Sequence, residues 1–254
     1  MTIHLRQICL VARDLAPAIA DLRAVLDLPV AHVDPAVGKY GLENTLLTVG
    51  TQFLEVVAPI RDNTAAGRYL DRRGGDGGYM VICQASSRAV QDELRENAAD
   101  ADVREAYFSD RGDWNILQLH PGDLKAAFLE VDWDAQDDPT GNWMPAGGLD
   151  WRDGGGTGAS IAAVDLQSDD PSALAELWGA VLGLPVDGPR ASPEIALADA
   201  RLRFVEDRDG RGPGLSALDL RMRDPAAARA RAAAAGLRSG SGAVICGTRF
   251  RFLD

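Results

Sequence analysis

The sequence is poor in the residues that build disulfide frameworks and soft-metal sites. Its three cysteines, Cys9, Cys83 and Cys246, lie far apart inside apolar segments, and no Cys-x-x-Cys pair is present. A disulfide framework or a thiolate zinc site is therefore not expected. Only three histidines occur, so histidine-based chemistry also has few candidates.

Positive charge and long apolar runs are scarce as well. The chain has 26 Lys and Arg against 38 Asp and Glu, for a net charge of −12. A nucleic-acid backbone or an anionic membrane surface would be repelled by this charge. No apolar run approaches the ~20 residues that a membrane-spanning helix requires. The N-terminal segment has neither a basic leader nor a small-residue cleavage site, so we expect a cytoplasmic protein.

What the sequence does contain is an internal repeat. The segment AVLDLPV at Ala24–Val30 returns as AVLGLPV at Ala180–Val186, with six of the seven residues identical. An aspartate precedes each copy, Asp14 in the first and Asp170 in the second, where it would cap a helix that leads into the repeated segment. Self-similarity on this scale indicates an architecture of repeated supersecondary structures.

The hydrophobic pattern extends this repeat to four copies of a strand, a helix and three strands. In the first copy a buried strand at Leu5–Val11 precedes a helix with one apolar face. We expect that face to consist of Leu15, Ile19, Leu22 and Leu26, and the following strands to lie at Ala31–Tyr40, Asn44–Val49 and Gln52–Pro59. The second copy predicts strands at Tyr79–Gln84, Val103–Phe108, Trp114–Leu119 and Ala126–Trp133, with a helix from Ser87. The third and fourth copies begin at Ala159 and Leu215.

An Asp, Gly and Pro-rich stretch separates the second and third copies. We expect a first domain at residues 1–134 with repeats at 1–76 and 77–134, a linker at 135–157, and a shorter second domain at 158–254 with repeats at 158–210 and 211–254. The linker carries Trp143 and Trp151, which a flexible tether does not need. We therefore interpret it as lying pinned across a domain surface, with a pocket-lining role as the alternative.

Three segments carry a resemblance to a known family: GLENTLLTVGTQFLEVVAP from Gly41, GGYMVICQ from Gly77 and LHPGDLKAAFLEV from Leu119. With the tandem βαβββ order, they resemble the glyoxalase-like branch of the vicinal oxygen chelate superfamily, which includes glyoxalase I, bleomycin-resistance proteins, methylmalonyl-CoA epimerase and extradiol dioxygenases. The resemblance implies an α+β fold of two paired-repeat domains, each a curved mixed sheet around a cavity with helices outside.

The resemblance also implies where metal ligands would lie, on the first and fourth strands of paired repeats. The corresponding positions are Gln7, Glu55, Met80 and Glu130, so both of the family's usual histidines are replaced. The oxygen donors Gln7, Glu55 and Glu130 suit a hard ion such as Mg²⁺, whereas the thioether of Met80 does not. The sequence leaves open a weakly bound divalent metal or no cofactor. In the second domain the matching positions are Ala163, Ala217 and the neighbourhoods of Phe204 and Phe250, which cannot bind a metal.

Other residues are candidates for ligand contact. Strand alternation places Phe53 beside Glu55 on one face, and Phe128 beside Glu130 and Asp132 on another. His120 precedes Pro121 in a step similar to one in epimerase-like relatives, and the alternative is a strand-end histidine bonded to backbone. Arg68 lies in a segment expected to form a helix capped near Asn63 or Thr64, where it would meet a substrate carboxylate or pair with a nearby aspartate.

Two functions follow. The first is metal-independent binding of a small organic molecule in the N-terminal-domain cavity, as in the bleomycin-resistance-type relatives. The second is a lyase or isomerase that uses Glu55 and Glu130 as acid and base, or as weak metal ligands. An extradiol dioxygenase is excluded because its iron requires two His and one carboxylate. A small molecule is the expected partner, and the chain is expected to be a monomer or a homodimer.

Overall fold

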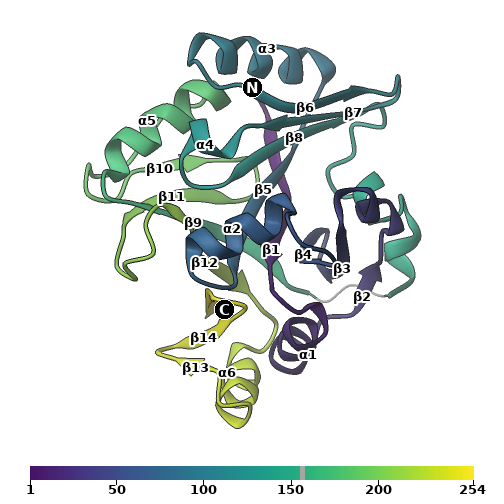
Figure 1. Ribbon diagram of the computed structural model, residues 1–254, viewed down its shortest axis with the longest axis vertical. Coiled ribbons are helices and arrows are strands. Elements are labelled where there is room, and N and C mark those ends of the chain that lie inside the picture. Colours follow the sequence, from purple (N-terminus) through teal and green to yellow (C-terminus); the bar gives the residue numbers. More distant parts are fainter. Residues whose placement is uncertain (155–157) are drawn as a thin grey trace. The chain divides into compact units, whose positions relative to one another are not determined.

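The computed structural model describes residues 1–154 and 158–254 (Figure 1). Residues 155–157 of the expected linker lie outside the described residues. The first repeat comprises β1 Ile3–Val11, α1 Leu15–Leu26, β2 Val30–His32, η1 Pro35–Tyr40, β3 Leu42–Val49, β4 Gln52–Pro59 and α2 Ala65–Arg73. The second comprises β5 Gly77–Ala85, α3 Arg88–Asp100, β6 Glu105–Asp110, β7 Trp114–Leu119, α4 Pro121–Leu124 and β8 Phe128–Asp134.

Two short 3₁₀ helices follow, η2 Met144–Ala146 and η3 Asp150–Gly154. The third repeat comprises β9 Ser160–Ser168, α5 Pro171–Leu182, β10 Glu194–Ala196 and β11 Arg201–Glu206. The fourth comprises β12 Gly214–Arg221, α6 Pro225–Ala234, β13 Arg238–Ser239, β14 Gly242–Ile245 and β15 Thr248–Leu253. Within the described residues no helix has the length and apolar character needed to cross a membrane.

The strands form two mixed sheets. The eight-stranded sheet has the order β2-β3-β4-β1-β5-β8-β7-β6, and the seven-stranded sheet has the order β10-β11-β9-β12-β15-β14-β13. In the second, third and fourth repeats the first and last strands run parallel, β5 with β8, β9 with β11 and β12 with β15, while the hairpins β3–β4 and β7–β8 are antiparallel. The predicted α+β fold is confirmed, and each sheet is built from the pair of repeats expected to share it.

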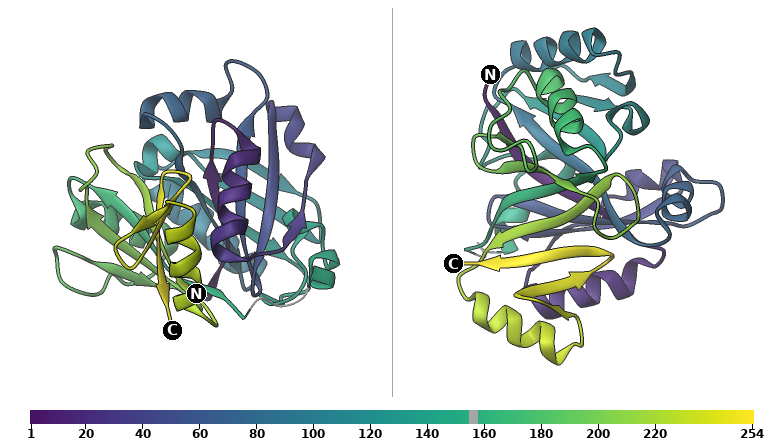
Figure 2. Two further views of the ribbon diagram at one scale, coloured as in Figure 1. Left: turned by 90° about the horizontal axis from the view of Figure 1, so that it is seen from below. Right: turned by 90° about the vertical axis from the view of Figure 1, so that its left-hand side faces the viewer.

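Contacts divide the chain into two compact units. The first contains residues 1–7, 79–142 and 163–215, and the second contains residues 8–78, 143–162 and 216–254. In the first compact unit α3 and α5 pack side by side (Figure 2), and the Trp178 indole N–H of α5 donates to the Leu124 carbonyl at 3.1 Å. In the second, α1 packs beside α6, and Arg231 Nε of α6 donates to the Val25 carbonyl at 2.8 Å. The domain boundaries expected from the sequence stay a prediction.

The internal repeat is visible in backbone geometry. α1 and α5 both end in a left-handed residue, at Asp27 with φ 57° and at Gly183 with φ 63°. These residues occupy the single position at which the repeated segments AVLDLPV and AVLGLPV differ. A left-handed C-cap is common at helix ends, and glycine adopts it without a steric penalty. Both copies therefore turn out of the helix in the same way.

Several local expectations need correction. The strand expected at Ala31–Tyr40 is only the short β2, because Asp34 accepts a hydrogen bond from the Ala36 N–H and Pro35 begins the 3₁₀ helix η1. In α1 the buried residues are Ala18, Leu22, Val25 and Leu26, while the expected Leu15 and Ile19 are half-buried. The helix expected after Arg61 is α2, and its N-cap is Thr64, which accepts from the Gly67 N–H at 2.9 Å.

The two repeated aspartates differ in what they stabilise. The Asp170 side chain accepts from the Ala173 N–H at 3.0 Å, whereas Asp14 occupies the N-cap of α1 without a side-chain capping bond. We expect Asp170→Ala to lower the free energy of unfolding by about 1 kcal/mol, and Asp14→Ala to lower it by much less. Thermal melts of the two variants measure the difference. Equal losses would show that the capping bond is not what distinguishes the two helices.

Candidate functional site

In the second compact unit, Glu55 of β4 is buried inside an apolar strand. Its side chain is 7% exposed, and its Oε1 accepts a hydrogen bond from Asn44 Nδ2 of β3 at 2.6 Å. The Asn44 oxygen in turn accepts from the backbone N–H of Asp34 at 2.9 Å. This second bond fixes the orientation of the amide, so that its N–H₂ group faces the carboxylate. A buried charge needs such donors, because desolvation without them is costly.

Aromatic groups flank this carboxylate. Strand alternation places Phe53 on the Glu55 face of β4, and Thr48 of β3 lies directly opposite Phe53 in the antiparallel register. The Trp151 ring of η3 meets the Phe53 ring edge-on, with the ring centroids 5.3 Å apart. The segment that carries Trp151 thus packs onto this face of the sheet. Both of its tryptophans, Trp143 and Trp151, are buried, which agrees with the interpretation drawn from their presence in the linker.

In the first compact unit, Glu130 of β8 has a similar environment. It is 6% exposed, and its Oε2 accepts from Gln118 Nε2 at 2.5 Å. Gln118 lies directly opposite it on β7. Each glutamate of the FLEV motif therefore receives a side-chain amide N–H from the neighbouring antiparallel strand. The carboxylates were predicted from the sequence but the two amides were not, although a polar residue inside an otherwise apolar strand was an available signal.

Two further acids follow Glu130 on the same face of β8. Asp132 is fully buried, and its Oδ2 accepts from the Trp114 indole N–H at 3.2 Å. Asp134 accepts from Asn142 Nδ2 at 2.5 Å. Burial raises the pKa of Asp132 well above its usual range, and the nearby charge of Glu130 raises it further. A carboxyl group whose pKa is raised by burial and by a neighbouring charge is typical of functional sites.

The first-strand candidates are a buried residue, Gln7, and a half-buried one, Met80. Gln7 of β1 is almost inaccessible to solvent. In the parallel register of β5 with β8, Met80 lies opposite Phe128 and Ile82 lies opposite Glu130, so Met80 belongs to the Glu130 face. The Phe128 ring packs against the Tyr79 ring with centroids 5.1 Å apart.

A buried arginine lies next to Gln7 in the sequence. The Arg6 guanidinium donates to Gln84 Oε1 of β5, and to the carbonyls of Asp138 and Gly141 at 3.3 Å each. These bonds fasten the loop after β8 to β1 and β5 within the first compact unit. Sequence reasoning did not single out Arg6, because an arginine in a strand is more often exposed.

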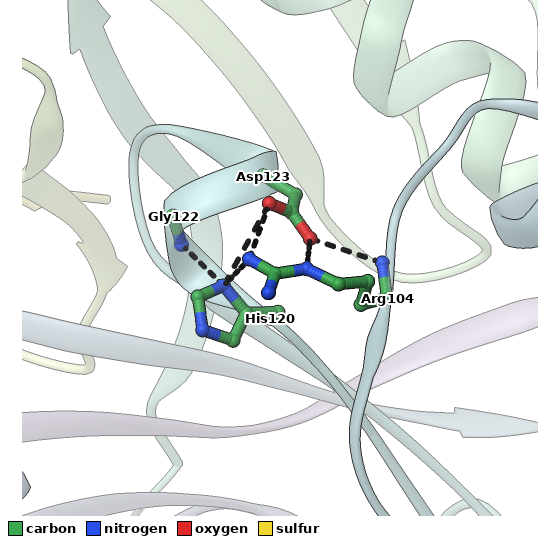
Figure 3. A network of polar contacts seen from close by, with 4 residues as sticks. All are labelled: Arg104, His120, Gly122 and Asp123. Atoms are coloured by element: carbon green, nitrogen blue, oxygen red, sulfur yellow. Dashed lines mark hydrogen bonds and ion pairs between the residues drawn. The ribbon is translucent and has the colours of Figure 1, made fainter.

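His120 and Arg68 have local partners. His120 is the N-cap of α4, and its Nδ1 accepts from the Gly122 N–H at 3.2 Å (Figure 3). Arg104 bonds both carboxylate oxygens of Asp123, at 2.8 and 2.9 Å, and these bonds lower the pKa of Asp123 to about 2. The structure thus gives His120 the backbone bond of the alternative interpretation. Arg68 is exposed and donates to the Asn63 carbonyl at 2.7 Å.

The donor set does not fit the family's metal. Among the described residues, no three His, Cys, Asp or Glu side chains lie in a group that could hold an ion. The expected set of Gln7, Glu55 and Glu130 offers two carboxylates and one amide, and it contains neither of the two histidines that the family's metal sites use. The sulfur of Met80 is a soft donor unsuited to the hard ions that carboxylates prefer.

The seven-stranded sheet carries ion pairs near the matching positions. Ala163, Ala217, Phe204 and Phe250 are buried apolar residues, as expected. Two residues after the alanines lie Asp165 of β9 and Asp219 of β12. Asp165 pairs with Arg203 of β11 at 2.8 Å, and Asp219 pairs with Arg251 of β15. Each Asp lies directly opposite its Arg in the parallel register. These carboxylates are paired with arginines.

Two family models match the chain, both described as a glyoxalase-like domain, at residues 8–182 and 162–241. A mutant of 4-hydroxymandelate synthase from Streptomyces coelicolor is similar in structure, with 17% identity, a TM-score of 0.67, and coverage of 94% of this chain and 78% of that one. A hypothetical protein from Staphylococcus aureus has 13% identity, a TM-score of 0.60, and coverage of 87% and 92%. Methylmalonyl-CoA epimerase from Mycobacterium tuberculosis matches with 22% identity and a TM-score of 0.44 over 52% of this chain and 88% of that one.

At these identities the first two solved structures show the fold that the chain shares with them. No curated protein matches the chain in a comparison of sequences.

The raised pKa of Asp132 predicts a pH-dependent stability. Above about pH 4, Asp132 has lost its proton in the unfolded chain but keeps it longer in the folded chain, because its folded-state pKa is raised. The free energy of unfolding therefore falls as the pH rises towards the raised pKa. We expect Asp132→Asn, which keeps an acceptor for Trp114, to remove this fall. Once the pH exceeds the raised pKa, the free energy of unfolding of Asp132→Asn should exceed that of the native protein by about 1.4 kcal/mol for each pH unit by which the pKa is raised.

Thermal melts from pH 4 to pH 9 measure this gain, with the exposed Asp92→Asn on α3 as the matched control. A Tm difference between Asp132→Asn and the native protein that stays constant over this range would contradict the assignment.

Proposed function

Because the chain belongs to the glyoxalase-like family of the vicinal oxygen chelate superfamily, we propose that it binds a small organic molecule in its N-terminal domain, beside the buried Glu55 of the eight-stranded sheet. The observation that carries the proposal is the environment of Glu55. This carboxylate is held by Asn44 and lies on a strand face with the Phe53 and Trp151 rings. Ligand sites commonly combine apolar and aromatic walls with a few oriented polar groups.

The binding domain in this proposal is residues 1–134, together with the segment that carries Trp151. Glu130 supplies a second oriented carboxylate, supported by Gln118, in the first compact unit. Gln7, Met80 and Phe128 are proposed as further contacts of the same ligand class. In this proposal the seven-stranded sheet is a duplicate that does not bind the ligand, because the acids Asp165 and Asp219 are paired with arginines.

Catalysis by the same carboxylates is the second candidate function, in the lyase or isomerase class. Its support is that both glutamates have an oriented amide donor, which places a carboxylate oxygen for proton transfer. A glutamate would take a proton from a carbon next to a carbonyl group, and the electron pair would move into the carbonyl oxygen. Return of a proton to that carbon would complete an isomerisation. No step is assigned to a metal, because the donor set does not fit one.

A ligand that binds the folded chain raises its stability by mass action. A thermal-shift screen of small carbonyl compounds, alcohols and organic acids should therefore yield a compound that raises Tm. At a concentration 100 times its Kd, the stabilisation is about 2.7 kcal/mol. We expect Glu55→Gln to weaken this ligand at least tenfold in titration calorimetry, because the oriented carboxylate acceptor that the ligand meets is replaced by an amide.

Glu43→Gln is the matched control, since Glu43 lies on β3 close to Asn44 but is exposed. A stabilising compound that binds Glu55→Gln and the native protein equally would place its site elsewhere. The screen is repeated with EDTA and with added Mg²⁺, so that a contribution from a metal would be seen as a change in Kd.

The catalytic alternative has its own test. If a bound compound exchanges a carbon-bound hydrogen for deuterium in ²H₂O, the exchange should slow at least 100-fold in the Glu55→Gln, Glu130→Gln double variant, because positioned bases contribute on the order of 10²-fold to 10⁴-fold. NMR loss of the ligand's proton signal measures the rate. Full retention of exchange in the double variant would exclude these glutamates as the base.

A further inference from the structure

Two buried polar atoms beside the Phe53 ring have no hydrogen-bond partner among the described residues. One is the indole Nε1 of Trp151, whose side chain belongs to a residue that is 6% exposed. The other is the hydroxyl Oγ1 of Thr48, which is fully buried. Buried side-chain donors nearly always have a partner, so two exceptions around one ring require an explanation.

Both atoms belong to the Glu55 side of the β3–β4 hairpin. Thr48 is directly opposite Phe53 in the register, and Phe53 shares the face of Glu55. Trp151 packs edge-on against the same Phe53 ring. The three residues come from two strands and from η3, which contacts the edge strand β2. Within the second compact unit, Thr48 and Trp151 therefore place two donors beside the Phe53 ring, on the strand face that carries the Glu55 carboxylate.

We propose that Trp151 Nε1 and Thr48 Oγ1 form a subsite for the carbonyl oxygen of a neutral organic ligand whose apolar part lies against Phe53. The inference rests on the proposed function and specifies the ligand's chemical class. The indole N–H can only donate, so its partner must be an acceptor. A hydroxyl group can donate to the second lone pair of the same oxygen.

The neighbouring carboxylate selects against anionic ligands. An anionic group at this oxygen position would lie close to Glu55 and would be repelled, whereas a ketone, aldehyde, ester or amide oxygen carries no net charge. The net charge of −12 on the chain acts in the same direction. A neutral carbonyl compound is therefore favoured over the corresponding acid, and its carbon-bound hydrogens or substituents are left to face Glu55.

The experiment uses acetophenone as the probe and ethylbenzene, which lacks the oxygen, as its apolar match. The full chain is labelled with ¹⁵N, and the five tryptophan indole signals are followed during titration, with Trp151 assigned from Trp151→Phe. We expect acetophenone to move the Trp151 indole proton downfield and ethylbenzene not to do so. The indoles of Trp178 and Trp114 are internal controls, because they already donate to the Leu124 carbonyl and to Asp132.

Two variants separate a donor from a packing residue. Trp151→Phe keeps a ring against Phe53, and Thr48→Val keeps the shape of the side chain while removing its hydroxyl. Each should weaken acetophenone binding about fivefold to tenfold, as expected for one lost hydrogen bond, and leave ethylbenzene binding unchanged. Each should also leave Tm of the free protein unchanged or raise it, because a buried polar atom without a partner is removed.

The outcomes distinguish the subsite from the proposed function. If acetophenone moves the backbone signals of β3 and β4 but not the Trp151 indole, the ligand site stands and the subsite is overturned. If both variants bind acetophenone as tightly as the native protein, the subsite is likewise overturned. If no signal moves with either probe, both the proposed function and the subsite lose their support. A shift of Trp151 that is lost in Thr48→Val supports the two-donor arrangement.

Discussion

The constraint on which this structure depends is the cost of placing a carboxylate inside an apolar strand. Glu55 and Glu130 are themselves buried and lie in apolar FLEV segments, so neither carboxylate can be hydrated as it would be at a surface. The chain meets this cost with an amide from the adjacent antiparallel strand, Asn44 in one case and Gln118 in the other. The hairpin register brings each amide beside its carboxylate. It must be kept, because a slip of one residue would place the amide and the carboxylate on opposite faces of the sheet.

The seven-stranded sheet meets the same cost in a different way. Asp165 and Asp219 each lie opposite an arginine in a parallel register, so their charge is compensated by a full positive charge. An amide donor leaves the carboxylate its negative charge, whereas an arginine neutralises it. Sheets of one repeated design therefore differ in electrostatic character, and only the eight-stranded sheet retains amide-bound glutamates in these positions.

The sequence predicts the repeats well because their signals are local. Leu-Pro-Val steps, N-cap residues such as Thr64 and Ser87, and period-2 strands such as Gln52–Pro59 are each defined by neighbours in the chain. The expectation for residues 31–40 is wrong where turn chemistry at Asp34 and Pro35 overrides an apolar run. The helix faces were displaced by about one residue, because small side chains such as Ala18 can be buried where a helix approaches a sheet closely.

The site was predicted less completely than the fold. Glu55 and Glu130 could be found because a charged residue interrupts an apolar strand. Their amide partners, the buried Arg6 and the donors at Thr48 and Trp151 depend on contacts between segments far apart in the chain, which periodicity does not report. His120 shows the converse, since the structure gives this residue, prominent in the sequence, a local helix-capping bond, while its contact with a ligand stays a prediction.

The segment that carries Trp151 separates the residues that cover Phe53 from the residues that stabilise the sheet. The Trp151 ring above Phe53 comes from a short 3₁₀ helix between repeats, and no strand pairing depends on it. Residues that set the register of the sheets are bound by the geometry of every neighbouring strand. The η3 segment takes part in no strand pairing, so its side chains can be substituted without changing the register of the sheet. In this chain, the surface presented over Phe53 and the stability of the sheet are encoded in different stretches of sequence.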